Sequence, residues 1–130
     1  YFDSITKKNT LFPMEKYWEI MSYTSIANGL MEAVLERFME ISRPEGEKSL
    51  KFIEKLETRT FRTIYWLEKN LNNFNDNNIT MDKIAIACAL EYTMFRFTDI
   101  WQKENLNLYN WLEKFNKNSF MQLTKPKVTL

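Results

Sequence analysis

Apolar residues recur at helical spacing along most of the chain. In residues 13–42 they follow one line through Tyr17, Met21, Leu30, Val34, Phe38 and Ile41. A second apolar line in the same stretch runs through Ile20, Tyr23, Ala27 and Met31. Two apolar lines predict a long helix with two buried faces, one against a helical bundle and one against a partner subunit. Pro13 suits the start of this helix, and Pro44 predicts its end near Ser42.

Residues 45–71 predict a second long helix, which pairs antiparallel with the first across a short turn. One face is apolar and the other carries Lys and Glu. The Asn-rich run at residues 72–78 then predicts a loop, because Asn and Asp tolerate left-handed backbone and bond their own main chain.

The stretch from Ile79 to Leu90 predicts a buried central helix that continues to about Phe97. Thr80 is the expected N-cap, its hydroxyl accepting from a backbone N–H one turn inside the helix. Ile79 and Ile84 have the spacing of a hydrophobic staple. Every residue from Ile84 to Leu90 is apolar, so this helix is expected to be buried on all sides.

The remaining residues predict shorter pieces: a connection at 98–101, a helix at 106–116, a last turn from Ser119 and a tail from Lys125. The fold class expected from the whole pattern is therefore all-α, a helical bundle.

Composition and net charge exclude several classes of function for this bundle. The chain of 130 residues is one domain's worth, and its net charge of +1 gives no electrostatic footprint for nucleic acid or an anionic membrane. No apolar run reaches the length of a membrane span. The absence of His excludes His-based catalysis and His metal ligands within these residues, and no other metal-ligand spacing or Gly-rich phosphate loop is present. The single cysteine, Cys88, is expected to be a buried structural thiol, and a catalytic thiol is the alternative.

Several of these stretches together resemble the C-terminal helical domain of cytosolic glutathione transferases of the bacterial type. The resemblance is carried by the run from Ile79 to Leu90, by Tyr92 and Phe95-Arg96-Phe97, and by residues 107–115. Residues 28–33, Asn-Gly-Leu-Met-Glu-Ala, are similar to an Asp-Gly-Ile-Met-Asp-Ala type of run in the first helix of that domain. The capping box of the family is incomplete here, because the third position after Thr80 is Lys83 and the acid lies at Asp82.

The resemblance implies three segments. Residues 1–12 match the end of an N-terminal thioredoxin-like domain plus a linker, residues 13–126 the helical domain, and residues 127–130 a tail. Taken alone, residues 1–12 also fit an ordinary N-terminal tail. The chain starts at Tyr1 without an initiator Met or a signal-peptide pattern, and we expect it to begin inside a larger protein.

The resemblance also implies a function and a set of site residues. The full-length protein would be a cytoplasmic, dimeric detoxification enzyme that conjugates the thiolate of its co-substrate glutathione to small hydrophobic electrophiles, without a metal. Its thiol-activating residue would belong to the N-terminal domain, so no catalytic residue is expected in this chain. Glu32 would reach glutathione bound to the neighbouring subunit, or would be a solvated Glu or a salt-bridge partner of Arg37 or Lys16. The electrophile pocket would be formed by Leu35, Phe38, Met39 and Ser42.

Two other readings stay open. The same helical domain occurs in non-catalytic interaction modules of translation factors, tRNA synthetases and transcription regulators, and these differ from the enzyme in their upstream domain. An unrelated helical bundle is the third reading.

Overall fold

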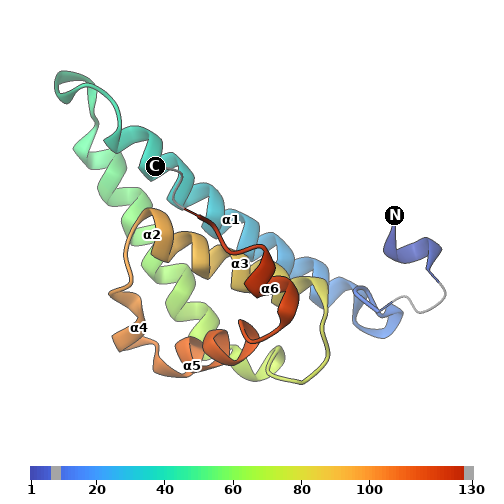
Figure 1. Ribbon diagram of the computed structural model, residues 1–130. Helices are drawn as coiled ribbons and strands as arrows, with labels where there is room; N and C mark the ends of the chain where they lie inside the picture. The colour runs from blue at the N-terminus through green and yellow to red at the C-terminus, as the bar shows by residue number, and fades with distance from the viewer. Residues whose placement is uncertain (7–9, 128–130) are drawn as a thin grey trace.

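The computed structural model describes residues 1–6 and 10–127, and within them every regular element is a helix (Figure 1). In chain order the elements are η1 (Asp3–Ile5), η2 (Met14–Lys16), α1 (Tyr17–Ile41), η3 (Glu45–Glu47), α2 (Leu50–Lys69), η4 (Leu71–Asn73), α3 (Met81–Arg96), α4 (Trp101–Glu104), α5 (Leu106–Phe115) and α6 (Ser119–Leu123). The all-α fold expected from the sequence is confirmed. The expected tail at 127–130 is described only at Lys127, and the rest of it lies outside the described residues.

Helices α1 and α2 form a long antiparallel hairpin whose far ends extend past the rest of the bundle (Figure 1). The prediction that the second helix starts at residue 45 was wrong. Glu45–Glu47 form a separate 3-10 turn after Pro44, and Ser49 is the N-cap, its hydroxyl accepting from the Phe52 N–H at 3.3 Å. The buried Glu40 carboxylate accepts from the Ser49 N–H at 2.8 Å, so it ties the end of α1 to the start of α2.

The boundaries of two other elements also differ from the prediction. Met14–Lys16 form a 3-10 turn, so α1 begins at Tyr17 and Pro13 precedes the helix. The expected connection at 98–101 already contains the start of α4, which begins at Trp101 with its side chain fully buried.

Helix α3 lies against α1 and α5, and α1 lies between α2 and α3 (Figure 1). Three small residues of α3, Ala85, Ala87 and Ala89, are all buried in the core. Leu90 is buried with them, and Leu30 and Val34 are the core residues from α1. The expected burial of α3 holds for most of its surface, and the exception is described below.

The start of α3 is fastened to the linker that precedes α1. The Met81 N–H donates to the Leu11 carbonyl at 3.1 Å. Leu11 and Phe12 in turn donate their backbone N–H groups to the two carboxylate oxygens of Asp3, at 3.1 and 3.0 Å. A continuous line of hydrogen bonds therefore joins the N-terminal turn η1 to the most buried helix.

Thr80 occupies the N-cap position of α3, but its side chain bonds differently from the prediction. The Thr80 hydroxyl donates to Asp82 Oδ1 and accepts no hydrogen bond from a backbone N–H of the helix. Asp82 is 4% exposed, so the Thr80 hydroxyl supplies a hydrogen bond to a buried carboxylate. Of the two expected staple residues, Ile84 packs against the core and Ile79 is 39% exposed, and the staple contact itself stays a prediction.

Lys83, which replaces the acid of a capping box, is 2% exposed. Its Nζ donates to Asp76 Oδ1 and to the Asn78 carbonyl, and so fixes the Asn-rich loop to α3. Burial raises the pKa of the Asp76 carboxyl, but the hydrogen bonds from Lys83 and the Asn78 N–H and the nearby Lys charges outweigh it and leave that pKa below its ordinary value. Lys83 is thus a structural anchor, which the capping pattern did not predict.

Candidate functional site

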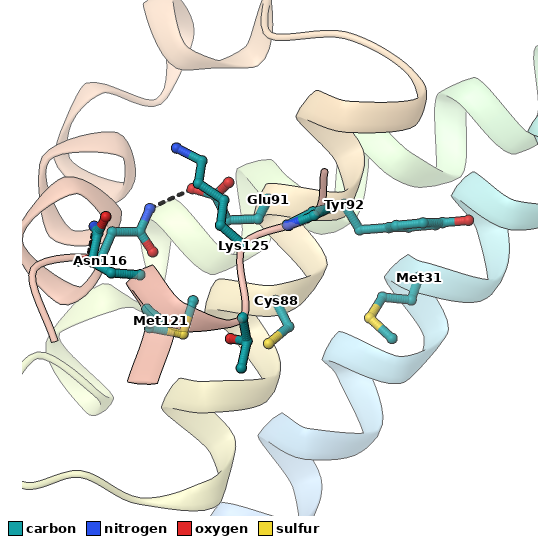
Figure 2. Close-up of a pocket in the computed structure, with 10 residues that line it drawn as sticks. Met31, Cys88, Glu91, Tyr92, Asn116, Met121 and Lys125 are labelled. Atoms are coloured by element: carbon teal, nitrogen blue, oxygen red, sulfur yellow. Dashed lines mark hydrogen bonds between the residues drawn. The ribbon is translucent and has the colours of Figure 1, made fainter. Parts of the chain in front are cut away.

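A pocket of about 240 Å³ opens between α1, α3 and the segment that follows α6 (Figure 2). Met31 comes from α1, while Cys88, Glu91 and Tyr92 come from successive turns of α3. The segment around α6 supplies the other lining residues, which are Asn116, Met121, Gln122, Thr124, Lys125 and Pro126. Two methionines, a tyrosine and a proline give the pocket apolar walls, and its polar side is formed by Glu91 of α3 together with side chains from the segment around α6.

The spacing of residues along α1 and α3 explains why these side chains meet. Cys88 and Tyr92 are four residues apart and therefore share one face of α3. In Figure 2 the Tyr92 ring reaches from α3 toward α1, where Met31 lies. Further along both helices Arg96 lies over the ring of Phe38, so α1 and α3 run in the same direction.

Cys88 is exposed, and the prediction of a buried structural thiol was wrong. Its neighbours Ala87 and Ala89 are fully buried, so the one unburied line of α3 passes through the cysteine. The sequence of this apolar run does not show which face of the helix stays uncovered, because Cys, Ala and Ile are all common in protein cores. Residual burial, followed by the negative charge of Glu91, raises the pKa of the Cys88 thiol above its ordinary value. The thiol is therefore protonated at neutral pH and is not an activated nucleophile.

The polar side of the pocket is fixed by hydrogen bonds. Asn116 Nδ2 donates to the Glu91 carboxylate, which connects the end of α5 to α3 (Figure 2). Gln122 Nε2 donates to the Asn116 carbonyl and holds α6 against the same point. Lys125 lines the pocket without an ion pair to any residue of the described chain. The site therefore offers an apolar floor with fixed polar groups on one side.

The residues predicted on α1 continue from this pocket along the same helix. Met31, Leu35 and Phe38 share one face at spacings of four and three residues. Leu35 is 44% exposed and Met39 is 61% exposed, while Phe38 is half-buried beneath the Arg96 guanidinium, 4.6 Å from its ring centre. Ser42 donates its hydroxyl hydrogen to the Phe38 carbonyl, so its side chain is turned back onto its own helix.

Glu32 lies beside this face and is exposed. The salt bridges considered for it do not form in the described chain, because Arg37 pairs with Glu57 and Lys16 with Asp76. Its carboxylate is therefore open to solvent or to a partner from outside the chain.

Sequence reasoning missed Cys88, Tyr92 and Lys125 as pocket residues. Met31 had been read as part of an apolar line, and Tyr92 as part of the resemblance. The regular spacing of Cys88, Tyr92 and Arg96 places them on one face of α3. The sequence alone does not show that other helices leave this face uncovered, so the spacing could not identify these residues as pocket residues.

Two further features are absent from the residues that the structure describes. No group of three or more His, Cys, Asp or Glu side chains there is placed to hold a metal ion. None of the helices is both long and apolar enough to cross a membrane.

Comparison of the sequence with family models and with curated proteins gives no significant match. Among solved structures, a glutathione transferase family member from Pseudomonas fluorescens with bound S-(propanoic acid)-glutathione matches 98% of this chain with a TM-score of 0.88. The sequence identity is 24%. The chain has the fold of the helical domain of glutathione transferases.

Two further structures share this glutathione transferase fold. A glutathione transferase from Methylobacillus flagellatus with glutathione bound matches with a TM-score of 0.89 over 98% of the chain, at 24% identity. One from Methylobacterium radiotolerans, in complex with glutathione sulfonate, matches with a TM-score of 0.83 over 92% of the chain, at 17% identity. The chain spans 68%, 66% and 59% of the length of the three structures, so it corresponds to a part of each.

Proposed function

We propose that this chain is the electrophile-binding and dimer-forming half of a glutathione transferase. The observation that carries the proposal is the match of nearly the whole chain, at TM-scores of 0.88 and 0.89, to structures that hold glutathione or its conjugate. In the full-length protein the glutathione thiolate would attack a small hydrophobic electrophile, forming a carbon–sulfur bond as the leaving group departs.

The same proposal assigns the segments of the chain. Residues 1–12 would complete a thioredoxin-like domain and its linker, residues 13–126 the helical domain, and residues 127–130 a tail. The thiol-activating residue would lie in the thioredoxin-like domain. The fraction of each neighbour that this chain spans supports this division.

The electrophile would lie on the face formed by Met31, Leu35 and Phe38 of α1 and by Tyr92 of α3. Exposed apolar side chains favour such a ligand, because each gains from being removed from water. The open Leu35 and Met39 side chains and the pocket beside Met31 support this placement.

The homodimer would form on the other exposed residues of α1. Trp18 is 79% exposed at the start of the helix, and Met21 lies one turn further on. An exposed tryptophan with neighbouring apolar side chains is typical of an interface between subunits. In such a dimer Glu32 would contact glutathione held by the neighbouring subunit, and the enzyme would work in the cytoplasm.

The test is glutathione conjugation by the full-length protein. The probe is a chloronitrobenzamide whose chlorine is activated by an ortho nitro group, and release of chloride reports the reaction. Turnover that requires both the protein and glutathione is the expected result. A full-length protein that binds no glutathione would overturn the proposal in favour of a non-catalytic interaction module.

A further inference from the structure

Two arginines lie side by side where α1 and α3 end, and they differ in their surroundings. The guanidinium of Arg37 lies 3.8 Å from the centre of the Phe97 ring, and its Nε donates to Glu57 at 2.7 Å. The guanidinium of Arg96 contacts two rings, and its central carbon lies 4.6 Å from the centre of Phe38 and 4.5 Å from that of Phe95. Arg37 is thus neutralised by a carboxylate of its own chain.

Arg96 has no such carboxylate. Among the described residues the guanidinium nitrogens of Arg96 make no hydrogen bond and no ion pair, and the residue is exposed. A guanidinium presents five N–H donors in its plane, and the contacts of its central carbon with the two rings leave these donors unpaired within the described chain. The two phenylalanines also restrict its orientation, which reduces the entropy lost when it binds a partner.

The position of Arg96 places this free cation at the end of the proposed electrophile site. Tyr92 lies one turn earlier on the same face of α3, about 6 Å along the axis. The Arg96 guanidinium lies over the ring of Phe38. Phe38 lies two turns beyond Met31, on the same face of α1. The apolar face between α1 and α3 therefore ends at a positive charge held in place.

We propose that Arg96 binds the carboxylate of the electrophile, so that the enzyme selects hydrophobic electrophiles that carry an acid group at one end. This inference rests on the proposed function, since it assigns the substrate class of the same site. The apolar body would lie on Leu35 and Tyr92, and its carboxylate would accept from the edge of the guanidinium. A planar carboxylate matches the two parallel N–H groups of that edge.

The chemistry to be tested is a substitution on an aromatic ring. The probe is a chloronitrobenzoate whose chlorine stands para to the carboxylate and ortho to the nitro group, and its primary amide is the neutral match. Glutathione thiolate attacks the carbon that bears chlorine, the carbon–sulfur bond forms, and chloride leaves with the electron pair of the broken carbon–chlorine bond. Both compounds undergo this reaction, and only the benzoate offers a negative charge to Arg96, so each variant is compared with the wild type on the same probe.

In the full-length protein we expect Arg96→Gln to lower kcat/KM for the benzoate by about tenfold, the scale of a charge-assisted hydrogen bond at a partly exposed site. The value for the benzamide should stay within about twofold, because the amide makes little use of the charge. Arg96→Lys keeps the charge without the planar edge and should retain part of the preference. Added salt should weaken the preference in the wild type, because the cation is exposed.

Two control variants separate this role from general charge effects. Arg62→Gln removes an exposed arginine of α2 outside the site and should leave the benzoate preference unchanged. Lys125→Gln removes the other unpaired cation near the pocket. A preference that is lost in Lys125→Gln and kept in Arg96→Gln would overturn the assignment to Arg96.

Calorimetric binding of the benzoate, without glutathione, distinguishes failure of this inference from failure of the proposed function. If the protein turns over both probes but Arg96→Gln affects them equally, the inference is wrong and the proposed function stands. If the protein conjugates neither probe but binds the benzoate about tenfold more weakly after Arg96→Gln, the acid site stands without the enzyme.

Discussion

At the scale of single residues, the pocket is distinguished by a thiol that is exposed but not activated. Cys88 lies on the only line of α3 that the neighbouring helices leave open within the described chain. Burial and the Glu91 charge both disfavour its thiolate. The residue is therefore accessible to reagents, although its reaction is slow at neutral pH.

Alkylation of Cys88 should follow this raised pKa. The rate of labelling by iodoacetamide in the folded protein, measured by mass spectrometry, should still increase with pH above 9.0, the ordinary value of the thiol. Glu91→Gln should shift the profile toward lower pH, because it removes the nearby negative charge. Since the folded-state pKa is raised, the linked stability is present below the unfolded-state pKa and is lost as pH rises through the folded-state value. A labelling profile with its midpoint below 9.0 would contradict the assignment.

Glu32 is the second residue with a prediction of its own. Its carboxylate is exposed and the cations considered for it are paired elsewhere, so in the proposed dimer a ligand of the neighbouring subunit would be free to reach it. In the full-length protein Glu32→Gln should raise KM for glutathione several-fold and leave KM for the electrophile nearly unchanged, as expected when binding of one substrate is weakened. Steady-state kinetics with both substrates varied, on a variant shown by light scattering to dimerise, is the measurement. An unchanged KM for glutathione would leave Glu32 as a solvated surface residue.

At the scale of elements, the start of α3 is stabilised by buried charged groups in place of a complete capping box. A glutamate at position 83 would complete the box pattern in the sequence, but its surroundings in the structure do not suit it. Lys83 is buried and bonded to Asp76 and Asn78, so a glutamate there would face another carboxylate. This helix end lies beneath the Asn-rich loop, which Lys83 anchors through these bonds.

Lys83→Glu should therefore lower the free energy of unfolding by about 2 kcal/mol or more, because it breaks a pair with one fully buried partner. Lys83→Met should cost less, because it leaves no second negative charge. Urea unfolding at neutral pH measures both. The stabilisation from the pair should be present above the ordinary pKa of Asp76 and lost as pH falls through its lowered folded-state value. A Lys83→Glu protein as stable as the wild type would show that the loop is not anchored in this way.

Thr80→Ala tests the neighbouring bond. It should destabilise the fold by about 1 kcal/mol, because the buried Asp82 carboxylate loses its donor. Thr80→Ser keeps the hydroxyl and should restore most of the loss. In an Asp82→Ala background Thr80→Ala should have little further effect, whereas a true N-cap bond would be lost in either background. The double-mutant cycle by urea unfolding decides between the two roles.

At the scale of the whole molecule, the sequence predicted the helical bundle and the buried α3 because both depend on the spacing of apolar residues. Leu35 and Phe38 were assigned to the site through the family resemblance, and that assignment stays a prediction. The sequence did not predict that Cys88 is uncovered or that Lys83 is buried, because both depend on how α6 and the Asn-rich loop pack over α3. The α2 boundary was missed because Ser49 gave a weaker signal than the turn residues before it.

One prediction concerns the chain as a whole. By itself it should bind glutathione too weakly for a calorimetric titration to saturate, because the contacts to the thiol and peptide backbone are expected from the thioredoxin-like domain. The full-length protein, titrated under the same conditions, is the control. A sub-millimolar constant for the chain alone, with a circular dichroism spectrum typical of helices, would place the glutathione site on this domain.

The line of hydrogen bonds from Asp3 through Leu11 to Met81 has a mechanical consequence. A pulling force applied to the N-terminal turn is transmitted through these hydrogen bonds to the first turn of α3, without passing along α1. Because α3 is held by the core, the linker cannot be peeled away one bond at a time without straining the innermost helix. The hydrogen bonds from Asp3 through Leu11 to Met81 therefore transmit tension into the centre of the bundle.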